Sequence, residues 1–212
     1  MLGLVSQIAQ VLMLRELLMV FHGNELTIGI ILCFWLAWVG CGSFLGFLVI
    51  RKQGRAVLCF TLSSAALLLF LPWTIYLIRI LRSFFSLAPG AWLSLGDTVL
   101  SCFLLMGPVC MLLGAQFIFL SRIWREKDGT TDVSGAAKTY MGEATGNMLG
   151  GLLFTLALVH LFSSMTTALM ICLLMLFSAG LLTSGTAPYS GLLKKRHVFL
   201  FNLQDYVFSS AP

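Results

Sequence analysis

Six runs of apolar residues, each long enough to cross a bilayer as a helix, constrain this chain more than any other feature. The hydrocarbon core of a bilayer is about 30 Å thick, which takes about 20 helical residues at about 1.5 Å each. The sequence predicts spans at residues 1–21, 26–50, 56–78, 93–121, 140–161 and 165–182. The continuous alternation of a β-barrel is missing, so helices are the spanning structure that satisfies the backbone. We expect an all-α, polytopic integral membrane protein.

Composition supports this class and excludes others. Apolar residues make up 59% of the 212 residues and charged residues only 10%, whereas a soluble domain carries about 25% charged residues. A soluble enzyme, a nucleic-acid-binding domain and a disordered regulator are therefore excluded. All six cysteines fall inside apolar runs, without a CxxC pair or a His cluster. They indicate neither a disulfide framework nor a metal site, and we expect no cofactor.

The distribution of basic residues predicts the orientation in the membrane. Residues 51–55, 122–138 and 194–196 lie on one side of the predicted spans and hold ten of the 13 Lys and Arg residues. The opposite side holds Arg79 and Arg82, and Arg15 lies within the first span. Cytoplasmic loops carry an excess of Lys and Arg. Both termini are therefore predicted to be cytoplasmic, which agrees with an even number of spans.

The connections are expected to be simple. Residues 1–182 are predicted to form one six-helix transmembrane domain, and residues 183–212 a short cytoplasmic tail without a folded domain. Residues 122–136 are polar and predict an exposed cytoplasmic loop. Residues 79–92 combine aromatic and basic side chains, which favours a position along the outer membrane interface.

The densest polar feature lies at the outer end of the first two spans. Ionisable groups in a membrane span are costly and often functional. One interpretation is a structural cluster in which Arg15 pairs with an acid, with Glu25 or Asp97 preferred on sidedness. The other is a vestibule for a solute or an ion. The residues of this cluster are Arg15, Glu16, Asn24, Glu25 and Asp97.

A second polar pair lies in the fifth predicted span. Glu143 and Asn147 share a helix face because they are four residues apart. A proton or cation site is one hypothesis, and pairing of Glu143 with Lys138 or Arg122 is the other. Intramembrane glutamines, among them Gln116, are expected to form hydrogen bonds between helices.

Small residues at helical spacing predict close helix packing. Gly142, Gly146 and Gly150 recur every four residues in the fifth span, and such a stripe lets a second helix approach closely. The second span offers Gly42 and Gly46 as a partner stripe. We therefore expect the fifth and second spans to pack together.

Several short motifs follow one another in order along residues 3–161. They are Arg15-Glu16-Leu17-Leu18, Phe21-His22-Gly23-Asn24-Glu25-Leu26, Ile28-Gly29, Trp35-Leu36, Gly42-Ser43, Leu113-Gly114-Ala115-Gln116-Phe117, and Tyr140, Glu143-Ala144, Gly146 and Gly150-Gly151. Together they resemble the amino-terminal membrane region of bacterial spermidine synthase-like proteins, in which a major-facilitator-like membrane half precedes a cytoplasmic aminopropyltransferase domain. The resemblance implies a polyamine-related module in the bacterial inner membrane.

The sequence departs from that family after residue 182. No segment there supplies the nucleotide-binding sheet with its Gly-rich loop that the family's soluble domain requires. We therefore expect a truncated product, a fragment or one part of a split system, which is not catalytic alone.

Six spans equal half of a twelve-span facilitator, which favours pairing with a second copy or a missing half. Alternative functions are a small-solute or polyamine transporter subunit and a membrane anchor for an aminopropyltransferase.

Overall fold

The computed structural model describes residues 1–21, 24–53, 55–84, 94–129 and 132–183, and this part of the chain is helical throughout apart from short connections. The chain is an all-α, multi-pass membrane protein, as the apolar runs predict. The helices that are long and apolar enough to cross a membrane number six among the described residues. The elements are α1 (Leu2–Phe21), α2 (Glu25–Gln53), α3 (Ala56–Phe84), α4 (Leu95–Asp128), α5 (Asp132–Leu153), the π-helical turn η1 (Phe154–Leu158), the short α6 (Val159–Leu161) and a final helix, Ser164–Thr183.

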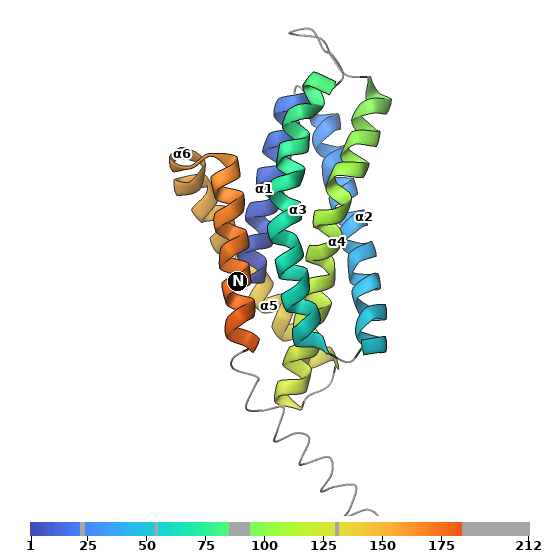
Figure 1. Ribbon diagram of the computed structural model, residues 1–212, viewed down its shortest axis with the longest axis vertical. Helices are drawn as coiled ribbons and strands as arrows, with labels where there is room; N and C mark the ends of the chain where they lie inside the picture. The colour runs from blue at the N-terminus through green and yellow to red at the C-terminus, as the bar shows by residue number, and fades with distance from the viewer. Residues whose placement is uncertain (22–23, 54, 85–93, 130–131, 184–212) are drawn as a thin grey trace, which may run out of the picture.

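Successive long helices run in opposite directions, as Figure 1 shows. The ends of α2 and α4 and the beginnings of α3 and α5 lie at one end of the bundle (Figure 1). We call this the basic end, because the described residues there include Arg51, Arg55, Arg122, Arg125, Lys127 and Lys138. The first residues of α1 and the last turn of the final helix point toward the same end (Figure 1). The end of α1 and the start of α2, the end of α3 and the start of α4, and α6 and the start of the final helix lie at the opposite end (Figure 1).

The connection between α4 and α5 differs from the sequence prediction. Residues 122–136 were expected to form a loop, but α4 continues as a helix to Asp128 and α5 begins at Asp132. Gly129 ends α4 with a positive φ of 62°, and its N–H donates to the carbonyl of Arg125. Hydropathy predicts where lipid ends, but a helix can continue past that point because its backbone groups still bond within the helix and α5 packs on α4 there, where Gly135 lies against Ser121 and Arg125. The amphipathic prediction for residues 79–92 falls partly on α3, which runs to Phe84; residues 85–93 lie outside the described residues.

Glycines bring α2 and α4 into backbone contact. A Cβ atom added to Gly42 would collide with the backbone of Met111, and one added to Gly46 would lie 2.9 Å from the Cα of Ala115. Facing them on α4, Gly114 lies against the carbonyl of Val39. The hydroxyl of Ser43 donates a hydrogen bond of 3.1 Å to the carbonyl of Gly114 across this contact. Close approach of two backbones is the usual consequence of small residues in membrane helices.

The glycine stripe of α5 packs on α1, not on α2 as predicted. A Cβ atom added to Gly146 would lie 2.8 Å from the backbone nitrogen of Leu4, and one added to Gly150 would lie 2.9 Å from the carbonyl oxygen of Leu4. Gly142 meets no described atom within 4 Å and so takes no part in this contact. The sequence could show that α5 permits close approach but not which helix approaches, because the partner depends on the arrangement of all six helices.

Helix α1 forms the centre of the bundle. It is the most deeply buried of the spanning helices, whereas α5 and α2 present most of their surface outward. Most of the large, fully buried side chains come from α1, α3, α4 and the final helix, and α2 contributes Ile31; the others include Leu12, Met13, Leu17, Leu67, Leu71, Met106 and Met175. Outward-facing leucines, phenylalanines and methionines on α2 and α5 suit contact with lipid.

Candidate functional site

An ion pair joins α1 to α3 at the end of the bundle opposite the basic end. Arg79 donates from Nε to Oε2 of Glu16 and from Nη2 to Oε1, and both distances are 3.0 Å. The Glu16 side chain is only 2% exposed, whereas that of Arg79 is 47% exposed. The hydroxyl of the buried Ser164, at the start of the final helix, also interacts with the Glu16 carboxylate. Three helices therefore converge on one carboxylate.

The two-pronged geometry explains how a carboxylate can lie in the interior of a membrane bundle. A guanidinium offers parallel N–H donors that match the two oxygens of a carboxylate. The pair has no net charge, and each carboxylate oxygen has a donor. Its arrangement stabilises a fixed contact between α1 and α3 and leaves the negative charge of Glu16 compensated.

The two residues that form the ion pair differ from those that the sequence predicts. The expected pairing joined Arg15 to Glu25 or Asp97, but within the described residues Arg15 makes no ion pair with either acid. Glu16 is the acid that pairs, and its partner is Arg79, for which the sequence predicts only a position at the outer membrane interface. Adjacent residues on a helix point about 100° apart. Glu16 therefore faces the interior, while Arg15 is only partly buried.

Two other members of the predicted cluster serve to cap helices. Asn24 precedes α2, and its Oδ1 accepts hydrogen bonds from the backbone N–H of Thr27 at 2.8 Å and from the Thr27 hydroxyl at 2.7 Å. At the start of α4, Ser94 accepts from the N–H of Asp97 and donates to the Asp97 carboxylate at 2.8 Å. These contacts satisfy N–H groups that a helix leaves without an internal partner. The structure therefore supports the structural interpretation of Asn24 and Asp97.

Glu143 and Asn147 lie where α5 meets α1. The backbone of Glu143 is so close to Gly3 that a Cβ atom on Gly3 would collide with the Glu143 carbonyl. Among the described residues Glu143 forms no ion pair, so the expected pairing with Lys138 or Arg122 is wrong. Arg122 pairs instead with Glu126 at 2.8 Å, one turn along α4. The Oδ1 atom of Asn147 is buried and has no hydrogen-bond partner in the part of the chain that the structure describes.

Gln116 forms the interhelical hydrogen bond that the sequence predicts. It is fully buried on α4, and its Nε2 lies 3.4 Å from the hydroxyl oxygen of Ser64 on α3. Its Oε1 has no partner among the described residues. The polar groups of the interior are thus dispersed: the ion pair at one end, Gln116 between α3 and α4, and Asn147 on α5.

Sequence reasoning missed Arg79 and Ser164 as parts of the ion-pair site. Arg79 ends a long apolar run, which signals an interfacial residue rather than an interior contact. Ser164 carries no charge and follows the end of the fifth span, so no local pattern distinguishes it from an ordinary loop serine. The described residues contain no group of three or more His, Cys, Asp or Glu side chains placed to hold a metal ion.

Comparison with known proteins gives the chain no relative: no family model, no curated protein and no solved structure matches it.

Proposed function

We propose that this chain is a polyamine-related membrane module that holds aminopropyltransferase activity at the bilayer and does not transfer aminopropyl groups itself. The motifs of residues 3–161 that resemble spermidine synthase-like proteins support the family, and the six spanning helices agree with its membrane half. In this proposal the protein lies in the bacterial inner membrane with both termini in the cytoplasm. Its catalytic partner is a separate domain, and a second copy or a further six-helix half completes the bundle.

The observation that carries this proposal is the compensated charge of Glu16. A transporter of a cationic amine needs a carboxylate that is free to bind the amine within the membrane. Glu16 is the most buried acid among the described side chains, yet both of its oxygens are held by Arg79. This arrangement favours a structural role for the acid and therefore favours an anchor over a polyamine transporter.

The test is purification of the full chain with an activity measurement. Chain purified in mild detergent from membranes of its native host should carry aminopropyl transfer to a diamine acceptor. The same chain purified from a host without aminopropyltransferases should carry none. Absence of activity from the native preparation would contradict the anchor, and product formation by the isolated chain would contradict a non-catalytic module.

A transporter subunit is the second candidate, and the α1–α5 contact favours it. Glu143 has no ion-pair partner among the described residues, and the buried Oδ1 of Asn147 lies one helical turn further along α5. Such groups suit a proton or cation site in a membrane protein. Saturable uptake of labelled spermidine by proteoliposomes that contain only this chain, abolished in the Glu143→Gln variant, would support this function instead.

A further inference from the structure

We infer that the basic end carries a binding site for an anionic phospholipid, formed by Trp124 and Lys127 of α4 and by Lys138 of α5. The ammonium group of Lys127 lies 5.4 Å from the centre of the Trp124 ring, and that of Lys138 lies 6.0 Å from it. Two positive charges from different helices thus meet at one indole. Cations are attracted to the face of an indole ring, so this arrangement holds both lysines at one place.

A close helix contact assembles the site. At the start of α5, a Cβ atom added to Gly135 would lie 2.7 Å from the carbonyl oxygen of Ser121 and 3.4 Å from the Cβ of Arg125. Glycine at this position lets α5 approach α4 closely, which brings Lys138 beside Trp124. Glu126, on the same turn of α4, is paired with Arg122 at 2.8 Å. The Arg122–Glu126 pair therefore adds no net charge to this end of α4.

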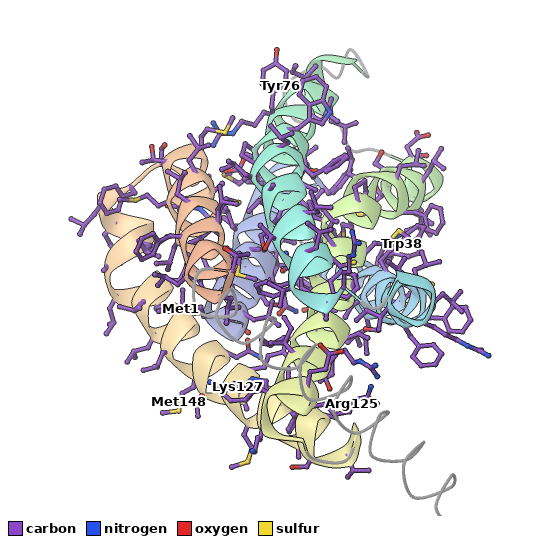
Figure 2. The ribbon with its side chains drawn as sticks, turned by 60° about the horizontal axis from the view of Figure 1, so that its bottom comes forward. Met1, Trp38, Tyr76, Arg125, Lys127 and Met148 are labelled. Carbon is purple, nitrogen blue, oxygen red and sulfur yellow. The ribbon has the colours of Figure 1, made fainter. Side chains whose placement is uncertain are left out.

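The site lies at the depth of lipid headgroups. Helix α4 has 34 residues and is therefore about 50 Å long at about 1.5 Å per residue, well beyond the bilayer core of about 30 Å. Its last turns and the start of α5 extend past the end of α2 and the start of α3 (Figure 1). Figure 2 turns this end forward and shows Arg125 and Lys127 there. Headgroup phosphates occupy this zone, and basic side chains close to an anionic membrane surface attract them.

An exposed apolar surface continues from the site toward the middle of the membrane. Residues at spacings of three and four along α5 share one face, and from Lys138 this face runs through Met141, Thr145, Met148 and Leu152. All of these side chains are exposed, Met141 by 69% and Met148 by 77%. An anionic head against the lysines and an acyl chain along this face match the two parts of a phospholipid. A free phosphate would use only the first part.

The test measures lipid binding by the full chain in mild detergent, by native mass spectrometry during titration with phosphatidylglycerol or phosphatidylcholine. The wild type should bind phosphatidylglycerol preferentially. The variant Lys127→Gln/Lys138→Gln should bind it about 30-fold more weakly. The matched control Arg51→Gln/Arg55→Gln removes the same charge from the same end and should retain the wild-type affinity. Equal losses in the two variants, or no loss in the first, would overturn the site.

Two further experiments complete the test. The first distinguishes binding of a lipid from binding of free phosphate, and the second distinguishes a loss of binding from a loss of folding. Inorganic phosphate and deacylated glycerophosphoglycerol should fail to displace the lipid at concentrations that match it; displacement at equal concentration would mean that the site recognises a soluble phosphate, and would overturn the proposal. If the double variant does not fold, the single variants Lys127→Gln and Lys138→Gln replace it. Each should then weaken binding about fivefold, and unchanged affinity in both would overturn the site.

Discussion

Arg79 and Glu16 lie 63 residues apart in the chain and are joined by two parallel hydrogen bonds of 3.0 Å. The pair ties α1, the most buried helix, to α3, and Ser164 adds the final helix to the same contact. The carboxylate is shielded from water by the bundle, while the guanidinium remains partly exposed at the end of α3. Removing one partner alone should therefore lower the stability of the fold more than removing both.

We expect Arg79→Gln to lower the free energy of unfolding by about 2–3 kcal/mol, because it leaves a buried carboxylate without its partner. The loss is smaller than the about 3–5 kcal/mol of a fully buried pair, since the guanidinium is 47% exposed. The double variant Glu16→Gln/Arg79→Gln should recover most of the loss. Unfolding of purified protein in detergent, followed by tryptophan fluorescence, measures both. As a control, Arg122→Gln breaks an exposed i,i+4 pair and should cost only about 0.3–0.5 kcal/mol. A double variant no more stable than Arg79→Gln would contradict the pairing.

Gly146→Leu should lower stability by roughly 1–3 kcal/mol, the usual range for overpacking, because its side chain would meet the backbone of Leu4. The control is Gly142→Leu, one turn earlier on α5, where no described atom lies within 4 Å of the added Cβ. That variant should unfold at the wild-type temperature. Equal effects of the two substitutions would mean that α1 does not pack on this stripe.

The α2–α4 contact can be tested with a smaller change. Gly114→Ala adds one methyl group against the Val39 carbonyl, where two backbones already touch. The helices must separate, and we expect a loss of about 1–3 kcal/mol. Gly40→Ala places the same methyl group on α2 where no described atom lies within 4 Å, and it should be neutral or slightly stabilising through helix propensity. Thermal unfolding in detergent compares the two variants. An unchanged unfolding temperature for Gly114→Ala would contradict direct backbone contact between α2 and α4 at this position.

Orientation in the membrane is tested by labelling cysteines. In a background without the six native cysteines, a cysteine at residue 53, at the end of α2, should resist a membrane-impermeant maleimide added to intact cells. A cysteine at Asn24, at the other end of the same helix, should react. The excess of basic residues at the end that carries residue 53 is the physical reason. Labelling of residue 53 from outside would reverse the proposed topology.

The sequence by itself determined the class of the protein and the position of its six spans, because the transfer of apolar side chains into lipid is a property that each helix has alone. It also predicted an interhelical hydrogen bond of Gln116, because a buried amide needs a hydrogen-bond partner. It predicted close approach of a second helix at Gly146 and Gly150, because glycine has no side chain to keep that helix away. Helix ends beyond the lipid were not predictable from hydropathy: α4 extends to Asp128 and α5 begins at Asp132, both within the residues expected to form a loop.

Only the tertiary structure decided which helices and which charges meet. The stripe of α5 packs on α1, and that of α2 packs on α4, because six helices can share an interior in several arrangements that leave the same residues facing lipid. Glu16 rather than Arg15 enters the interior and meets Arg79, because the rotation of α1 about its axis is set by all the helices that pack against it. Neither the choice of partner helices nor the rotation of α1 about its axis can be read from the residue pattern of any one span.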